Sequence, residues 1–187
     1  MNNEEQLKKI KEEVLSCTNC PLYKERKLPV IGQGNHNAKI IFIGEAPGAK
    51  EDATGVPFCG RSGDFLNELL EHINLKREDV YIANIIKCRP PHNRDPKEIE
   101  IDKCKKFIER QIEIINPKII CSLGRHSMNF MMKSLGIDPQ PISKVHGKVF
   151  EKRRLFIPFY HPAVAIYNSN TKEILKKDFE ILKDYVN

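Results

Sequence analysis

Lys39-Ile-Ile-Phe-Ile-Gly44 begins the stretch of sequence that decides the fold, and it runs directly into Glu-Ala-Pro-Gly-Ala-Lys-Glu-Asp-Ala-Thr-Gly-Val-Pro-Phe-Cys-Gly-Arg-Ser-Gly63. The first part is short, apolar and rich in β-branched side chains, a pattern that predicts a buried strand. Residues 44–63 contain five glycines and two prolines. This composition disfavours a regular element but lets backbone amides approach a ligand closely. We therefore expect the floor of a pocket directly after the strand.

The spacing of the glycines in this loop disfavours the commoner nucleotide sites. The loop contains neither Gly-x-Gly-x-x-Gly nor the Gly-Lys-Ser/Thr ending that cradles phosphates. A dinucleotide or ATP site is therefore not expected. Taken alone, the loop also fits a structural alternative, a long surface segment punctuated by turns.

Length and composition set the outer limits of the interpretation. The chain has 187 residues, of which 40% are hydrophobic, and this suits a single domain spanning residues 1–187. The first residues are charged, and no run of eighteen apolar residues occurs, so we expect a cytoplasmic protein without a membrane partner. The net charge of +6 is compatible with a polyanionic partner but is weak support for one.

Six cysteines in a reducing compartment are better explained as ligands or core residues than as disulfides. Cys17 and Cys20 form a Cys-x-x-Cys pair, Cys88 lies in a proline-rich loop, and Cys104 lies on the inward stripe of a predicted helix over 96–116. Four such thiolates could hold zinc or a cubane iron–sulfur cluster, and the wide spacing of the second pair favours iron. The alternative is scattered buried cysteines plus a redox pair.

The other two cysteines have simpler interpretations. Cys121 lies in a predicted strand over 118–123 and is expected in the core, whereas Cys59 is expected to be an apolar lining residue beside the pocket.

Two polar residues follow or end predicted strands. Asn84 lies near the carboxyl end of the strand 79–86, and a buried amide there is either a structural bracket or a reader of a polar ligand edge. His161 follows the strand 154–160, and Pro162 fixes the turn that presents it. A lone histidine at a strand end is more often a capping or surface residue than a catalyst.

The order of the predicted elements indicates an α/β fold. It reads: a helix before Cys17, strand 39–44, the glycine-rich loop, helix 62–72, strand 79–86, the cysteine-bearing loop, helix 96–116, strand 118–123, helix 125–135, a hairpin-like pair, strand 154–160 and a final helix starting near Thr171. Such alternation predicts a mainly parallel sheet covered on both faces, with ligands bound beyond the carboxyl ends of its strands. The loop after Gly44, Asn84 and His161 would then converge on one crevice.

Four motifs, together with the four spaced cysteines, resemble a known family. They are Gly44-Glu-Ala-Pro-Gly48, Pro57-Phe-Cys-Gly-Arg-Ser-Gly63, Asn84-Ile-Ile-Lys-Cys-Arg-Pro-Pro-x-Asn-Arg94 and His161-Pro-Ala163. In this order they look like a family 4 uracil-DNA glycosylase, the thermostable iron–sulfur type. The resemblance implies a three-layer α/β/α sandwich around a four-stranded, mainly parallel sheet and a [4Fe–4S] cluster. It also implies a DNA-repair hydrolase that removes uracil and leaves an abasic site, without a lyase step.

The resemblance also implies roles for individual residues. Phe58 would stack on the flipped-out uracil, Asn84 would read N3 and O4, and His161 would meet O2. An asparagine can accept from N3–H while donating to O4, a pattern that cytosine reverses. Further implied roles are backbone contacts to the base from Glu45 and Ala46, a flanking or water-activating carboxylate at Glu51 or Glu45, and cluster ligation by Cys17, Cys20, Cys88 and Cys104.

The chain departs from the family pattern at two places. Cys59 replaces the usual valine, and after His161 the family's wedging leucine is replaced by Ala163, Val164, Ala165 and Ile166. We expect either that Ile166 or Tyr167 assists base extrusion or that extrusion is weaker than in the family. The sequence has no evident extra loop bearing the histidine of a related group that links covalently to uracil-containing DNA, so turnover is expected rather than self-trapping.

Arg89, Arg94 and Lys148 are expected to contact DNA phosphates, on single- or double-stranded DNA, in a monomeric protein. One alternative is a non-catalytic or uracil-trapping iron–sulfur DNA-binding module, supported by the basic residues Lys87, Arg89, Arg94, Lys144, Lys148, Lys152, Arg153 and Arg154. These residues could equally form a solvated surface. A cytosolic redox protein is the third alternative. The convergence of Phe58, Asn84 and His161 favours the enzyme.

Overall fold

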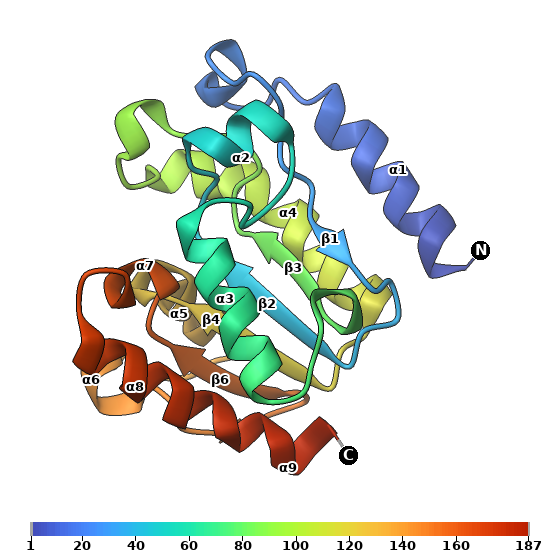
Figure 1. The fold of residues 1–187 in the computed structure, drawn as a ribbon. Helices are drawn as coiled ribbons and strands as arrows, with labels where there is room; N and C mark the ends of the chain where they lie inside the picture. The colour runs from blue at the N-terminus through green and yellow to red at the C-terminus, as the bar shows by residue number, and fades with distance from the viewer. Residues whose placement is uncertain (1, 187) are drawn as a thin grey trace.

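The computed structural model describes residues 2–186, whose strands form one sheet with the order β1-β3-β2-β4-β6-β5 (Figure 1). The strands are β1 (Gln33–Gly34), β2 (Ile40–Gly44), β3 (Tyr81–Asn84), β4 (Ile119–Leu123), β5 (Phe150–Glu151) and β6 (Leu155–Phe159). The central four are parallel, and β1 and β5 add antiparallel edges. The α/β class and the parallel core are confirmed, but the predicted count of four strands becomes six. The two additional strands have two residues each and are too short to show a period in the sequence.

Helices alternate with the strands along the chain. They are α1 (Asn3–Leu15), α2 (Ala49–Thr54), α3 (Arg61–His72), α4 (Glu98–Ile115), α5 (Arg125–Ser134), α6 (Ile142–Val145), α7 (Pro162–Ala165), α8 (Ser169–Phe179) and α9 (Lys183–Val186), with 3₁₀ turns η1 (Pro21–Lys24), η2 (Arg77–Asp79), η3 (Pro91–Asn93) and η4 (Glu180–Leu182). No helix among residues 2–186 is long and apolar enough to cross a membrane.

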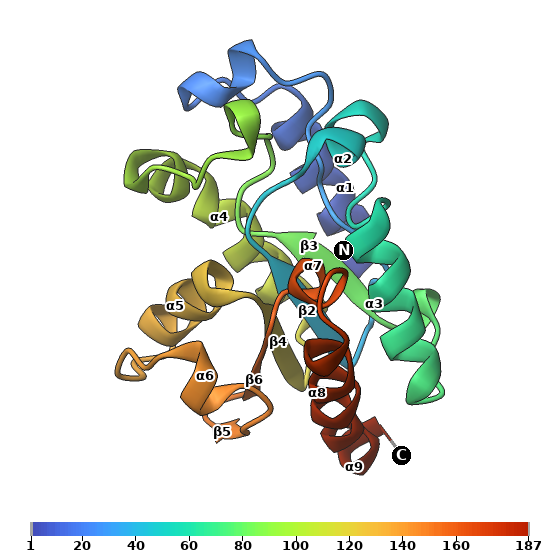
Figure 2. The same cartoon turned by 60° about the vertical axis from the view of Figure 1, so that its left-hand side comes forward.

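The sheet separates two apolar cores. Successive side chains of β2 alternate between them, with Ile41 and Ile43 on one face and Ile40 and Phe42 on the other. The first core contains the buried sides of α1, α4 and α5, and the second contains those of α3 and α8. Figure 2 shows α4 and α5 on one side of the strands and α3 and α8 on the other. The three-layer arrangement implied by the resemblance is confirmed.

The carboxyl ends of the parallel strands meet at one edge of the sheet. Gly44 at the end of β2 is in register with Asn84 at the end of β3, and His161 follows β6 on the far side of β4. Gly124, directly after β4, adopts a φ of +93°, and a Cβ there would lie 3.0 Å from the Cβ of His161. The backbone at this edge therefore leaves room for the histidine.

The final third of the chain differs from the predicted boundaries. The short helix α7 was not predicted, and α8 begins at Ser169 rather than near Thr171. Asn168 causes the earlier start, since its side-chain oxygen accepts a hydrogen bond from the Thr171 amide at 3.1 Å and caps the helix.

Candidate active site and four-cysteine site

A pocket of about 520 Å³ lies at the carboxyl edge of the sheet. Its walls include all the residues predicted to meet the base or the reacting bond, namely Glu45, Ala46, Glu51, Phe58, Asn84 and His161. They come from the ends of strands, from α2 and from the glycine-rich loop. The prediction that these residues lie around one crevice is therefore confirmed.

Asn84 lies at the floor of this pocket with one polar atom unpaired. The residue is 2% exposed, and its Oδ1 is buried without a hydrogen-bond partner among residues 2–186. Gly44 allows this close packing, because a Cβ there would lie 2.3 Å from Oδ1 and 2.8 Å from the Phe58 ring. A buried acceptor without a partner costs about 1–3 kcal/mol. A ligand N–H placed here would remove that cost.

Phe58 presents its ring from a strained backbone. Its φ is +48°, in the left-handed region that non-glycine residues seldom adopt. The ring is buried, and its centroid lies 5.6 Å from the centroid of the His161 ring, at an interplanar angle of 27°. Gly63 permits this conformation, since a Cβ at that position would lie 1.7 Å from the Phe58 carbonyl oxygen.

His161 is held as a neutral imidazole of one tautomer. It caps α7, and its Nδ1 accepts a hydrogen bond from the Ala163 amide at 3.1 Å. Burial lowers the pKa of His161 from 6.5 to about 4, an effect that the carboxylate of Glu51 only partly opposes. Because Nδ1 is an acceptor, the single proton of the neutral ring resides on Nε2. The structure thus makes His161 a neutral hydrogen-bond donor through Nε2.

The two predicted acidic residues occupy different environments. Oε1 of Glu51 accepts from the amides of Cys59 and Gly60, at 3.2 and 3.3 Å, so this carboxylate also fixes the loop that carries Phe58. Glu45 faces His126, whose Nε2 lies 3.7 Å from a Glu45 carboxylate oxygen. Burial raises the pKa of Glu45, and His126 partly offsets this.

Sequence reasoning did not identify the partners of Glu45. His126 is half-buried in the first turn of α5, and Asp95 lies in the loop after β3, with an oxygen 3.2 Å from His126 Nε2. Only the fold brings these side chains beside Glu45, so no spacing in the sequence could indicate them.

The loop between Cys88 and α4 forms one wall of the pocket through Pro90, Asn93, Arg94 and Asp95. Arg94 donates to both carboxylate oxygens of the buried Glu100, at 2.6 and 2.9 Å, and thereby ties the loop to α4. Nε of Arg89 donates to Asn93 Oδ1 at 2.8 Å. Contacts of Arg89 and Arg94 with phosphate stay predictions.

The set of basic surface residues needs correction at two positions. Lys87 is 1% exposed, and its ammonium group donates to the Asn84 carbonyl oxygen at 2.8 Å and to Gln111 Oε1 at 2.7 Å. It therefore cannot contact a phosphate at the surface. The side chain of Arg154 is 9% exposed and is bound by Glu113 and Asn116.

The remaining predicted residues lie near the pocket or at the surface. Lys148 is exposed, Ile166 is half-buried after α7, and Tyr167 is 83% exposed. Cys121 is in the core as predicted. The interpretation of Cys59 was wrong, because its Sγ lies 3.2 Å from Thr54 Oγ1 and the residue does not line the pocket.

The four predicted ligand cysteines meet at a second place. Cys17, Cys20, Cys88 and Cys104 line one small pocket between η1, the loop after β3 and α4. All are free thiols. Arg26 donates to Cys88 Sγ at 3.1 Å, and the Lys87 amide donates to Cys104 Sγ at 3.3 Å. Burial raises the pKa of Cys104 to about 11, so a bound cation is what would make this group a thiolate at neutral pH.

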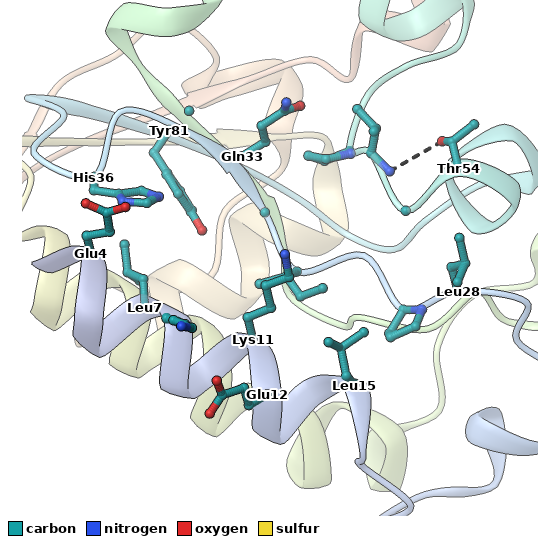
Figure 3. A pocket seen from close by; sticks show the side chains of 18 residues that line it. Glu4, Leu7, Lys11, Glu12, Leu15, Leu28, Gln33, His36, Thr54 and Tyr81 are labelled. Carbon is teal, nitrogen blue, oxygen red and sulfur yellow. Dashed lines mark hydrogen bonds between the residues drawn. The ribbon is translucent and has the colours of Figure 1, made fainter.

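A larger cavity of about 680 Å³ lies between α1 and the segment 28–34 (Figure 3). Its wall mixes apolar side chains, such as Leu7 and Leu28, with charges of both signs, such as Lys11 and Glu12. Over residues 2–186, no unpartnered buried side-chain atom belongs to this cavity. The smaller pocket, with the open acceptor of Asn84, is the stronger candidate for a specific site.

Comparison with known proteins gives a family match and several similar relatives. A family model described as the uracil DNA glycosylase superfamily matches residues 31–183, a range that leaves out Cys17 and Cys20. A type-4 uracil-DNA glycosylase of Sulfurisphaera tokodaii is 46% identical over 184 residues, covering 95% of this chain and 84% of the relative. Proteins of the same name from Archaeoglobus fulgidus (44%, covering 94% and 91%) and Thermotoga maritima (40%, covering 98% and 96%) are similarly close.

Proposed function

The chain belongs to the uracil DNA glycosylase superfamily, and from this premise we propose that the pocket of Phe58, Asn84 and His161 binds uracil flipped out of DNA. The chain is a hydrolase that removes uracil from DNA in repair, the activity for which its type-4 relatives are named. The unpartnered Oδ1 of Asn84 carries the assignment of the pocket.

The chemistry of the pocket suits uracil and rejects cytosine. Oδ1 of Asn84 would accept from uracil N3–H, and its amide nitrogen would donate to O4. Cytosine offers no hydrogen at N3 and presents a donor where uracil has O4, so both contacts would fail. Phe58 would cover one face of the base. Stacking of a base on an aromatic ring contributes about 1–3 kcal/mol to its binding.

His161 would supply the electrostatic part of catalysis. Cleavage of the bond between N1 and the sugar C1′ leaves negative charge on uracil and positive charge on the sugar, to which a water oxygen then adds. The neutral ring can donate from Nε2 to O2 as that charge develops. Glu51 and Glu45, two of the carboxylates that line the pocket, would orient the water and receive its proton.

The four cysteines fit an iron–sulfur cluster better than a zinc ion. Four sulfurs at about 2.3 Å from one zinc would lie about 3.8 Å apart. Within residues 2–186, no three cysteine sulfurs lie within 4.8 Å of one another. We infer that Cys17, Cys20, Cys88 and Cys104 would hold a [4Fe–4S] cluster, which when bound would cross-link these segments and supply a one-electron couple. N–H donors from Arg26 and Lys87 support this assignment.

DNA would approach over the basic and apolar groups around the pocket. Arg89, Arg94 and Lys148 are the proposed phosphate contacts, and Ile166 or the exposed Tyr167 is the proposed wedge into the duplex. We propose that a monomer carries out the reaction on single- or double-stranded DNA.

The direct test is cleavage of an oligonucleotide that contains one uracil, followed by alkali to break abasic sites. We expect strand scission with the uracil strand and none with the matched thymine strand. Asn84→Ala should abolish scission, whereas Asn37→Ala, in the exposed loop between β1 and β2, should retain it.

The same assay distinguishes an enzyme that turns over from a protein that traps its DNA covalently. A denaturing gel without alkali would show a retarded protein–DNA adduct if the chain captured its substrate covalently. Uracil-dependent scission with multiple turnovers supports the enzyme, and intact uracil DNA in every assay would contradict it.

A further inference from the structure

Arg77 holds the backbone of Phe58 from outside the pocket. It belongs to η2, between α3 and β3, and is not among the residues that line the pocket. One guanidinium nitrogen donates to the Phe58 carbonyl oxygen at 3.1 Å, and the other donates to the carbonyl oxygen of Pro57. A single side chain thus binds two successive carbonyl groups of the loop.

The loop needs this restraint because its conformation is strained. A non-glycine residue at a φ of +48° has an unfavourable backbone conformation, which persists only where its surroundings fix it. The empty space at Gly63 permits the Phe58 carbonyl to approach α3 but does not bind it. Arg77 supplies the attraction.

The chemistry of the contact requires arginine. A planar guanidinium presents parallel donors that can engage two carbonyl groups at once, whereas a lysine ammonium is a compact point charge. Arg77 is further oriented by Asn67, whose Oδ1 accepts at 3.3 Å. The guanidinium is half-buried, so its two carbonyl contacts are shielded from competing water.

We infer that Arg77 is a positioning residue that keeps the Phe58 ring in the orientation required to stack on the base. This inference rests on the proposed stacking role of Phe58. It predicts that loss of Arg77 weakens binding of the base through Phe58, without a contact of its own to DNA or uracil.

A double-mutant cycle tests the inference. The measurements are single-turnover cleavage of uracil DNA and competitive inhibition by free uracil, which reports base binding without DNA. In the wild-type background, we expect Arg77→Met to weaken uracil inhibition about tenfold, as contacting residues commonly couple to this extent. In the Phe58→Ala background, the same substitution should change inhibition less than about twofold.

Controls distinguish positioning from loss of folding. Arg110→Met removes an arginine that binds Glu13 between α1 and α4, away from the pocket, and should leave uracil inhibition unchanged. Arg77→Lys keeps the charge but lacks the parallel donors that bind both carbonyl groups, so it should resemble Arg77→Met. If Arg77→Met fails to fold, Arg77→Lys completes the cycle. Free guanidinium at a non-denaturing concentration can replace the missing side-chain group, so it should partly restore the inhibition of Arg77→Ala by uracil.

Each outcome decides a specific point. Equal effects of the Arg77 substitution in both backgrounds would overturn the inference, and so would wild-type inhibition in Arg77→Met. If Phe58→Ala itself left cleavage and uracil inhibition unchanged, the proposed stacking role would fail, and the inference would fail with it. Failure of the inference alone would leave the Phe58→Ala defect in place.

Discussion

The proposed uracil pocket and the four-cysteine site share the loop after β3, but they are organised in opposite ways. In the pocket, contacts with the backbone position two of the residues: the Ala163 amide binds the His161 ring, and Arg77 binds the carbonyl groups of Pro57 and Phe58. In the cysteine site, thiols from the segment between α1 and η1, the loop after β3 and α4 line one small pocket, and N–H donors such as Arg26 and the Lys87 amide bind their sulfurs. The pocket is preorganised by the polypeptide, whereas the cysteine site is a place where a bound group would complete the structure.

Lys87 is the physical link between the two sites. Its amide donates to Cys104 Sγ, and its ammonium group donates to the carbonyl oxygen of Asn84. Gln111 anchors the same ammonium group and also donates to the carbonyl oxygen of Ile31. A disturbance of the cysteine site can therefore reach the pocket floor through one buried side chain.

The largest expected effect is on the cysteine site. Cys104→Ala should remove iron and lower the free energy of unfolding by about 5 kcal/mol or more, because binding of a metal centre contributes directly to folding. DNA affinity should fall with it, since the 88–96 loop forms a wall of the pocket. Iron analysis, visible absorbance and thermal melting provide the measurements.

Cys121→Ala is the matched control, because it makes the same change in the core outside both sites. It should keep its iron and its brown colour. Unchanged melting and iron content in Cys104→Ala would remove Cys104 from the ligand set. A colourless wild-type protein with one zinc would contradict the cluster.

The next effect tests recognition in the pocket. Asn84→Asp should reduce binding of uracil about a thousandfold or more, because it replaces the donor to O4 with an acceptor and can place a charge in a dry site. Cytosine could then gain weak acceptance. The measurement is equilibrium binding of DNA that carries a non-cleavable uracil analogue.

Asn93→Asp provides a comparison on the wall of the same pocket, where the residue is exposed. Its effect on analogue binding should be far smaller. If Asn84→Asp bound the analogue as tightly as the wild-type protein, Asn84 would not be the residue that recognises N3 and O4 of uracil.

A smaller effect separates catalysis from recognition. His161→Ala should slow single-turnover cleavage about a hundredfold or more, the usual consequence of removing a donor to developing negative charge. Analogue binding should be largely retained. His72→Ala, an exposed histidine paired with Glu180, is the control and should cleave normally. Loss of analogue binding with an unchanged bound-state cleavage rate would make His161 a ground-state contact only.

The strands, and the meeting of their carboxyl ends at the pocket, could be predicted because both follow from the local pattern of apolar residues. β2, β4 and β6 are continuous apolar runs buried throughout or nearly so, and their carboxyl ends must meet at one edge when the strands are parallel. Asn84 and His161 were placed correctly for this reason.

The supporting contacts could not be predicted because they join distant segments. Arg77 lies nineteen residues from Phe58, and Lys87 lies 24 residues from Gln111. Lys87 was grouped with surface bases because lysine is seldom fully buried, and only its partners in the fold explain the exception. Two-residue edge strands likewise depend on their neighbours rather than on their own sequence.

The last expected effect is the pH dependence that His161 contributes to stability. Its pKa is about 4 in the folded protein and 6.5 without burial, so between these values the unfolded state binds more protons. Stability should therefore fall as the pH decreases from 6.5 to 4, with a slope of up to about 1.4 kcal/mol per pH unit from this residue. Glu45 and Asp178 act in the opposite direction, because burial raises the pKa of each carboxyl group.

The difference between wild-type protein and His161→Gln isolates the histidine from those carboxyl groups. Glutamine keeps a polar side chain of similar reach but does not titrate, so the difference in unfolding free energy should change across pH 6.5–4 and level off above this window. Denaturant unfolding at several pH values measures it. Parallel curves for the two proteins would mean that His161 is not held neutral in the folded state, and the donor role of its Nε2 would lose its basis.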